Sequence, residues 1–274
     1  MAENDDMQRY NVLLETLKGF DSLLVAYSGG LDSTLLAYAA HQSLGDKSLA
    51  ITAVSPSLAQ ADRQRAARIA RQVGFRHQEI ETEELQKPNY RKNDPDRCFH
   101  CKTELFNRMK ALAAELNFST LAYGAIPEDQ SDHRPGARAA QLAEVIAPLA
   151  QAGLTKPALR RLSQTFGLET WDLPAQACLA SRIAYQTPVS AAKLRMVEEG
   201  EALLKSLGFE SCRVRHHNGL ARIEVPLPRL QELLDQRELI SDQFRRLGFV
   251  YVTLDLMGLR SGSMNEILKL RVLD

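Results

Sequence analysis

The sequence of 274 residues is poor in several features that mark particular classes of protein. It has no excess of charge, because 34 Lys and Arg balance 34 Asp and Glu, whereas general nucleic-acid binders carry a basic surplus. No apolar run approaches the ~20 residues that span a bilayer, and the acidic segment 1–6 lacks the apolar stretch of a signal peptide. We therefore expect a cytoplasmic protein with no membrane partner.

Cysteine is also scarce. The four cysteines are Cys98, Cys101, Cys178 and Cys212, which is too few for a disulfide scaffold in a chain of this length. In a reducing compartment such residues are typical of metal ligands, catalytic groups or buried thiols. Cys212 has no partner at a motif spacing, so we interpret it as structural.

The hydrophobic pattern predicts an α/β protein with a second, smaller domain. Short buried strands alternate with helical patterns over residues 22–126, which indicates a doubly wound parallel sheet. Beyond it, a loop-rich stretch precedes a helical pattern over 190–207 and two alternating runs that flank Asn218-Gly219, a strong hairpin signal. We expect one domain over 1–170, a linker with Cys178 over 171–188, and a small α+β domain for substrate or oligomer contacts over 189–274.

The most informative motif is residues 27–33, Y-S-G-G-L-D-S, between a predicted strand and a predicted helix. Glycines let the backbone approach a ligand closely, and the amides at a helix N-terminus favour an anion. Asp32 adds a carboxylate that can hold Mg²⁺ beside phosphates, and Ser33 can cap the helix. The residues alone fit a phosphate loop or a tight glycine turn about equally well.

The motif S-G-G-x-D-S resembles the PP-loop of the N-type ATP pyrophosphatases, which adenylate a substrate and release pyrophosphate. The resemblance implies an adenine nucleotide alpha hydrolase-like fold that uses ATP and Mg²⁺, with Asp32 as a catalytic residue. It also implies that the phosphates and the metal are bound by Ser28, Gly29, Gly30, Asp32 and Ser33.

Other segments resemble the LarE sulfur transferases, above all residues 174–182, P-A-Q-A-C-L-A-S-R. Further similarity lies in 132–136, 213–215, 221–225, 251–256 and 260–266, and Gln186 stands where a glycine is expected. The resemblance implies adenylation of pyridinium-3,5-biscarboxylic acid mononucleotide and its conversion to thiocarboxylates for a nickel-pincer cofactor. It also implies a homo-oligomer, a sulfur donor and a downstream nickel-inserting protein as partners. By this resemblance Arg213, Arg215 and Glu201 belong to the substrate or metal site, with Glu201 taken as a metal ligand. Arg182 is a further candidate for the substrate because it lies close to Cys178 in sequence.

Two schemes for the sulfur stay open. Cys178 can give up its own sulfur, or Cys98, Cys101 and Cys178 can hold a [4Fe-4S] cluster that carries a spare sulfide, which we favour. A C-x-x-C pair supplies two thiolates from one helical turn, but two buried thiols or a redox pair have the same spacing. Arg213 and Arg215 lie two residues apart on a strand and so share a face, which fits a phosphate clamp or a solvated surface.

The main alternative function is a PP-loop tRNA thiolase, which also uses cysteines for sulfur transfer. Such an enzyme needs a basic surface, because phosphate neutralisation supplies most of the affinity for RNA. The balanced charge makes tRNA an unlikely partner and favours a small mononucleotide. A nucleotide sensor without catalytic activity is a further alternative.

Overall fold

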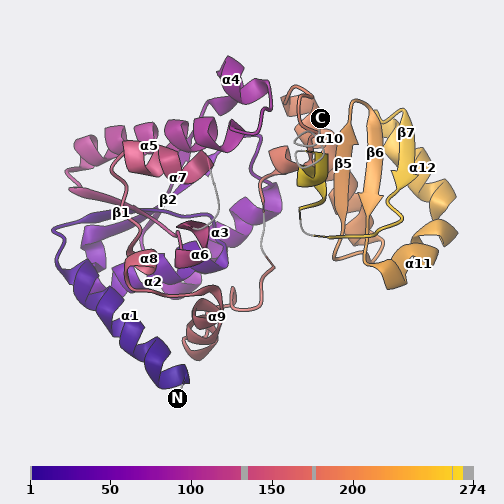
Figure 1. The fold of residues 1–274 in the computed structure, drawn as a ribbon. Coiled ribbons are helices and arrows are strands. Elements are labelled where there is room, and N and C mark those ends of the chain that lie inside the picture. Colours follow the sequence, from indigo (N-terminus) through magenta and orange to yellow (C-terminus); the bar gives the residue numbers. More distant parts are fainter. Residues whose placement is uncertain (1, 131–134, 175–176, 261, 268–274) are drawn as a thin grey trace. The chain divides into compact units, whose positions relative to one another are not determined.

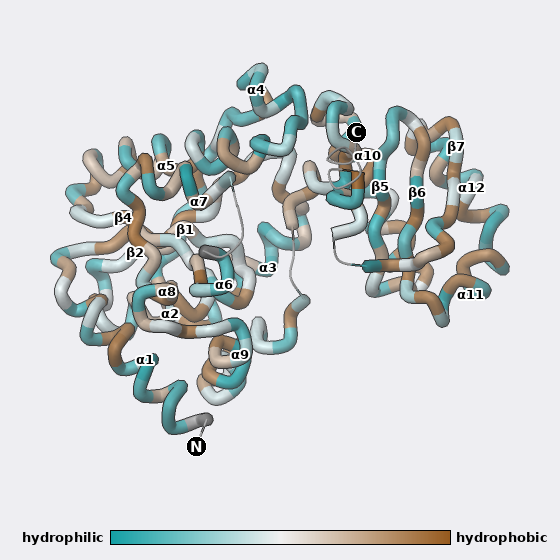
Figure 2. The backbone as a smooth tube through the Cα atoms, viewed as in Figure 1, coloured by the Kyte–Doolittle hydropathy of each residue, from teal (hydrophilic) through white to brown (hydrophobic). Residues whose placement is uncertain are grey.

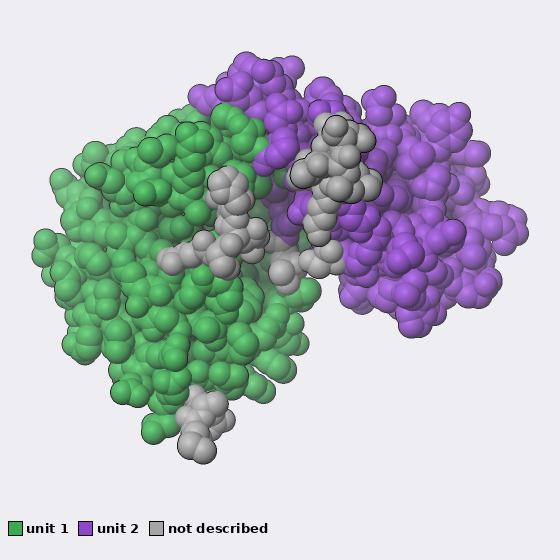
Figure 3. Space-filling model, in the orientation of Figure 1, with its two compact units in different colours: residues 1–84, 96–176 green, residues 85–95, 177–274 purple. Residues whose placement is uncertain are grey.

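The structure is a computed structural model that describes residues 2–130, 135–174, 177–260 and 262–267, without the side chains of Ala2, Glu3 and Gln130. Parts of the motifs 132–136, 174–178 and 260–266 lie outside the described residues. The chain forms two compact units, coloured separately in Figure 3. Unit 1 comprises Met1–Glu84 and Asp96–Gln176, and unit 2 comprises Leu85–Pro95 and Ala177–Asp274.

Unit 1 is built on a parallel sheet whose four strands follow the order β3-β2-β1-β4 (Figure 1). The strands are β1 (Leu23–Ala26), β2 (Ser48–Val54), β3 (His77–Glu81) and β4 (Thr120–Tyr123). The helices are α1 (Ala2–Lys18), α2 (Leu31–Leu44), α3 (Gln60–Val73), α5 (Arg97–Leu116), α6 (Pro127–Gln130), α7 (Pro135–Leu142), α8 (Pro148–Gln151) and α9 (Lys156–Thr165), with the 3₁₀ turn η1 (Gly45–Lys47). The prediction of an α/β fold with a parallel sheet is confirmed.

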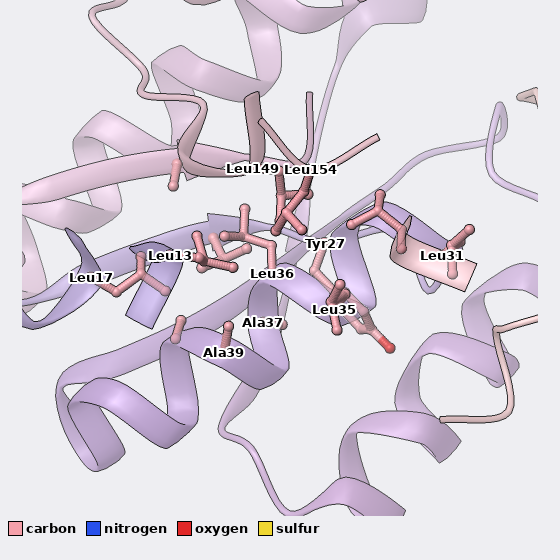
Figure 4. Packing of buried hydrophobic residues seen from close by; sticks show 14 of the residues in the cluster. Leu13, Leu17, Tyr27, Leu31, Leu35, Leu36, Ala37, Ala39, Leu149 and Leu154 are labelled. Atoms are coloured by element: carbon pink, nitrogen blue, oxygen red, sulfur yellow. The ribbon is translucent and has the colours of Figure 1, made fainter. Parts of the chain in front are cut away.

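The central strand β1 is apolar throughout because both of its faces are buried. Leu23 and Val25 pack on one face with α1, α2, α3, α8 and α9, and Leu24 packs on the other with α5 and α7 (Figure 1). Figure 4 shows the first of these layers, in which Leu36 of α2 lies between Leu13 of α1 and the leucines around α8, while Leu35 lies beside Tyr27.

The order of the strands decides where a ligand can bind in unit 1. The chain leaves β1 toward β2 and β3, and then returns to the other side of β1 as β4. In open α/β sheets, ligands bind at the carboxyl ends of the strands where the winding reverses in this way. The loops after β1 and β4 therefore flank the expected site.

Unit 2 contains the second sheet, of order β5-β6-β7. Its elements are α4 (Pro88–Arg91), η3 (Leu179–Arg182), α10 (Ala191–Ser206), β5 (Arg213–His217), β6 (Leu220–Glu224), η4 (Leu227–Arg229), α11 (Leu230–Asp235), α12 (Arg237–Arg246), β7 (Tyr251–Leu254) and η5 (Ser263–Asn265), while η2 (Glu84–Gln86) spans the change of unit. The hairpin expected at Asn218-Gly219 joins the antiparallel strands β5 and β6. Hydrophobic and hydrophilic residues alternate along α12 (Figure 2), whose buried Ile240 and Phe244 join the core of this unit.

The segment 85–95 is held in unit 2 by the buried side chain of Asn93 and by backbone hydrogen bonds. The Asn93 amide nitrogen donates to the carbonyls of Ile183 and Thr187, at 3.2 and 3.1 Å, and to that of Ala184 at 2.8 Å. Gln186 has a φ of +64°, a left-handed conformation that favours glycine, and its N–H donates to the Asn93 carbonyl. This conformation explains why a glycine is expected at Gln186. The position of the segment in unit 2 is not evident from the sequence.

Candidate active site

The loop 28–33 turns from β1 directly into α2. The Ser33 hydroxyl oxygen accepts from the Ser28 N–H at 3.1 Å, and the two hydroxyl oxygens lie 3.1 Å apart. Gly30 is the N-cap residue, and no side chain caps the helix there. Because a glycine has no side chain, the N-cap residue offers no acceptor to the first amides of α2, and free amides at a helix N-terminus can bind a phosphate.

Two glycines let this loop pack closely. Gly29 has a φ of +69°, and a Cβ atom on it would lie 2.9 Å from both Cα and Cβ of Ala66 in α3. Gly124 follows β4, and a Cβ atom there would lie 3.0 Å from the Ser33 backbone nitrogen. The loops after β1 and β4 thus meet at the reversal of the sheet, with no room for side chains between them.

We predict that Gly29→Ala destabilises unit 1 more than a similar change elsewhere. An alanine in a left-handed conformation costs about 1–2 kcal/mol, and the clash with Ala66 adds about 1–3 kcal/mol. The control is Gly167→Ala, because Gly167 has a similar φ of +68° and nothing within 4 Å of its added Cβ. Urea denaturation measures both free energies of unfolding. Equal losses for the two variants would show that the loop has room for a side chain.

Asp32 forms an ion pair with Lys156, which lies 124 residues later in the sequence of unit 1. The Lys156 ammonium lies 2.7 and 2.9 Å from the two carboxylate oxygens of Asp32. Burial raises the pKa of Asp32, and the hydrogen bond and charge of Lys156 oppose that rise. Asp129 and Arg160 also act on Asp32 electrostatically, with opposite signs. The site therefore combines acidic and basic groups from α2, α6 and α9.

Lys156, Gly124 and Arg65 also belong to this site, although the motif at residues 27–33 does not predict them. Arg65 lies on α3, donates to the Gly29 carbonyl at 3.4 Å and pairs with Asp62. The local signal for Lys156 is weak: Pro157 is typical of a helix start, and a lysine is unfavourable at the positive end of a helix. Only the folded chain brings Lys156 to Asp32, 124 residues away in sequence.

Unit 2 contains the remaining residues implicated by the sequence, apart from the C-x-x-C pair. Cys178 is exposed at the N-cap of η3. Arg182, at the other end of this turn, donates to the Ala177 and Cys178 carbonyls, the latter at 3.1 Å, and its Nε donates to Glu201 Oε1 at 3.0 Å. Glu201 Oε1 also accepts from the Val214 N–H. The buried pair Arg182–Glu201 thus fixes the backbone beside Cys178, and a metal at Glu201 stays a prediction.

Arg213 and Arg215 differ in how their charges are compensated. Arg215 is buried and pairs with Glu224 at 2.8 Å, and its guanidinium also donates to the Ser263 hydroxyl. Arg213 donates to the Cys212 carbonyl at 2.7 Å, and within the described residues no carboxylate pairs with it. Burial, followed by the charge of Arg182, lowers the pKa of Arg213. Of these arginines, Arg213 is therefore the one whose charge an added anion would compensate best.

The C-x-x-C pair belongs to unit 1. Cys98 and Cys101 lie in the first turns of α5, Cys98 exposed and Cys101 partly exposed. In the part of the chain that the structure describes, no group of three or more His, Cys, Asp or Glu side chains is placed to hold a metal ion. Helix α5 therefore supplies two thiols that could bind a metal or cluster, and a third cysteine ligand would have to come from another segment.

Cys212 is buried in the core of unit 2, and burial raises the pKa of its thiol to about 12. We predict that iodoacetamide at pH 8 modifies Cys98 and Cys178 quickly and leaves Cys212 unmodified, because the thiolate is the reactive form. Peptide mass spectrometry after timed quenching measures this order, and modification in urea provides the unprotected reference. Early modification of Cys212 would contradict its structural role.

Comparisons with known proteins bear on both units. The family model described as NAD synthase matches residues 10–121, which include the loop 28–33. The pyridinium-3,5-bisthiocarboxylic acid mononucleotide synthase of Lactiplantibacillus plantarum is 35% identical over 257 residues, 93% of this chain and 93% of that protein. The chain belongs to this LarE family.

Two further relatives match over a similar length. An uncharacterized protein of Synechocystis sp. is 41% identical over 93% of this chain and 97% of its own. One of Methanocaldococcus jannaschii is 26% identical over 92% of this chain and 95% of its own. Because each alignment covers more than nine-tenths of the chain, the relationship extends over both units. Among the residues described here, no helix has the length and apolar character to cross a membrane.

Proposed function

We propose that this protein is an ATP-dependent sulfur transferase that converts the carboxylates of pyridinium-3,5-biscarboxylic acid mononucleotide to thiocarboxylates for a nickel-pincer cofactor. The observation that supports this most strongly is the uncapped helix N-terminus with Asp32 beside it, in a chain related over its length to a synthase of the bisthiocarboxylic product. The NAD synthase match supports a nucleotide loop and does not identify the acceptor, because it ends before Cys178.

Adenylation is the first chemical step of the proposal. A carboxylate is a poor electrophile because of its charge and resonance, and transfer of AMP to it creates a good leaving group. The amides after Gly30, together with Ser28 and Ser33, would hold the phosphates of ATP, and Asp32 would hold Mg²⁺. ATP is a substrate of this step, and Mg²⁺ would enter the site together with it.

Recognition of the mononucleotide is assigned to Arg213. Its guanidinium is partly buried and has no carboxylate partner among the described residues, so a phosphate would compensate its charge. Arg182 and Arg215 are engaged with Glu201 and Glu224. Because those carboxylates compensate their charges, Arg182 and Arg215 would bind an anion less strongly than Arg213.

Sulfur transfer is assigned to Cys178, whose exposed thiol stands on backbone held by Arg182. In one version, the Cys178 thiolate attacks the acyl adenylate and AMP leaves, which gives a thioester. A base then takes the Cα proton of Cys178, the Cβ–S bond breaks, the thiocarboxylate leaves with the electron pair, and Cys178 becomes dehydroalanine. In the other, Cys98, Cys101 and Cys178 would ligate a [4Fe-4S] cluster, which supplies a reloadable sulfide when it is bound. Two accessible thiols one helical turn apart fit two of those ligand positions.

The sulfur source is tested with Cys98→Ala. The cluster version expects the anaerobically purified protein to contain iron and sulfide and Cys98→Ala to lose both with sulfur transfer. The sacrificial version expects neither iron nor sulfide, normal single-turnover transfer by Cys98→Ala, and a Cys178 peptide that lacks its sulfur after reaction. Absence of iron and sulfide would exclude the cluster version, and loss of sulfur transfer in Cys98→Ala would exclude the sacrificial version.

The proposed function as a whole is tested by anaerobic incubation with ATP, Mg²⁺ and the pyridinium dicarboxylate mononucleotide. We expect one pyrophosphate per carboxylate activated, and mass spectrometry should show oxygen replaced by sulfur in the product. Activation of a different acceptor, such as bulk tRNA, with no reaction of the mononucleotide would refute the assignment and favour the thiolase alternative.

A further inference from the structure

The C-terminal motif at residues 260–266 has no part in the function proposed so far. Within it, Ser263 begins the turn η5 and is only 4% exposed. Its hydroxyl donates to Glu224 Oε1 at 2.7 Å and accepts from the Arg215 guanidinium at 3.1 Å. The C-terminal segment thus places a hydroxyl against the buried ion pair of Arg215 and Glu224.

Both oxygens of Glu224, which is fully buried, have hydrogen-bond donors. Oε2 accepts from Nε and Nη2 of Arg215, at 3.1 and 2.8 Å. Oε1 accepts from Ser263 and, at 3.2 Å, from the Arg222 guanidinium. Because a buried carboxylate is stable only when donors satisfy it, these three residues fix the direction in which Glu224 points.

The register of the hairpin offers Glu224 a different partner. Arg213 of β5 lies directly opposite Glu224 of β6, so both side chains leave the same face of the sheet. Opposed residues have Cβ atoms about 4.5–5.5 Å apart, and opposite charges at such positions attract. In the described part of the chain, however, no hydrogen bond or ion pair joins Arg213 to Glu224. Arg213 keeps its uncompensated charge because the opposing carboxylate is turned toward other donors.

The charges around Glu224 balance one another without Arg213. Ion pairs of alternating sign run through Arg215, Glu224, Arg222, Asp255, Arg260 and Glu266. This series contains three cations and three carboxylates, so none of its carboxylates is left over for Arg213. Because Ser263 is neutral, it occupies Glu224 without changing that balance.

We propose that Ser263 is a positioning residue of the mononucleotide site, where its hydroxyl holds Glu224 away from Arg213. Without this hydroxyl, Oε1 of Glu224 loses a donor, and turning toward Arg213 restores one. Glu224 then competes with the phosphate of the substrate for the same guanidinium. The inference rests on the proposed function, because it assumes that Arg213 binds that phosphate.

The test compares Ser263→Ala with Ser263→Thr, which keeps the hydroxyl, and with Ser206→Ala, the same change at an exposed position of α10. Titration calorimetry without ATP measures Kd for the pyridinium dicarboxylate mononucleotide and for the riboside that lacks its phosphate. We expect Ser263→Ala to bind the mononucleotide about 10-fold more weakly and the riboside as the unmodified protein does. Ser263→Thr should recover most of the lost affinity, and Ser206→Ala should lose none.

The riboside separates positioning from a purely structural role. If Ser263→Ala weakens both ligands equally, the residue only maintains the fold of unit 2, and the inference is wrong. It is also wrong if Ser263→Ala binds both ligands normally, and the proposed function then stands. If the unmodified protein binds the mononucleotide no more tightly than the riboside, Arg213 does not recognise the phosphate and the inference fails with that assignment, while pyrophosphate release tests the reaction separately.

Discussion

Cys178→Ala is expected to release pyrophosphate once per active site and to form no thiocarboxylate. In the proposed reaction, adenylation takes place at the loop after β1 in unit 1, whereas Cys178 stands on η3 in unit 2, so we expect the first step not to need the thiol. Without a sulfur nucleophile, the acyl adenylate stays bound and blocks further turnover. Rapid quenching with pyrophosphate analysis gives the burst, and mass spectrometry of the denatured complex identifies the adenylate.

The control for this experiment is Cys212→Ala. It removes a thiol from the same unit, but one that is buried in the core with its pKa raised by burial. The small cavity is expected to cost about 1 kcal/mol of stability and to leave product formation intact. Thiocarboxylate formation by Cys178→Ala at the normal rate would place the sulfur on the Cys98–Cys101 helix alone.

The sequence predicts the central strands of the unit 1 sheet well because β1 and most of β2 are buried on both faces. β1 and β2 appear as short apolar runs, and α3 and α9 show a helical period that identifies their buried sides. The hairpin of unit 2 is equally clear, since Asn218 and Gly219 both take the left-handed conformations that a tight turn requires. In each case the signal lies within one local segment.

The sequence does not predict features that depend on distant partners. Segment 85–95 looks like a connection within the first domain, yet Asn93 hydrogen-bonds to carbonyls about 90 residues later. The short helices α6, α7 and α8 have too few turns for a hydrophobic period to appear. These elements are stabilised by tertiary contacts more than by their own propensity.

The same limit applies to the candidate site. The motif identifies Asp32 and the loop because the relevant residues are consecutive. It cannot show that Lys156 reaches Asp32, or that Arg182 and Arg215 are paired with Glu201 and Glu224, because charge pairing is decided by folding. A spacing of two residues in β5 suggests equal roles for Arg213 and Arg215, and the structure separates them by their partners.

Asp32→Asn is expected to lower the rate of pyrophosphate release about 10²- to 10³-fold while leaving the fold intact. Asparagine keeps the size of the side chain but removes the negative charge that we propose holds Mg²⁺ and that pairs with Lys156. Because the ion pair is partly exposed and burial raises the pKa of Asp32, its loss should change the free energy of unfolding by about 0–1 kcal/mol. Loss of activity without loss of stability distinguishes a catalytic carboxylate from a structural one.

The matched control is Asp46→Asn, the same change at an exposed position of η1 in the same unit. Titration of Mg²⁺ at saturating ATP then identifies the cause of the lost activity. If Asp32 holds the metal, Asp32→Asn should need much more Mg²⁺ for half-maximal activity, and Lys156→Met should not show that shift to the same degree, because it retains the carboxylate. An unchanged Mg²⁺ requirement in Asp32→Asn would mean that Asp32 serves only as the partner of Lys156, and the metal would have to be bound by the phosphates alone.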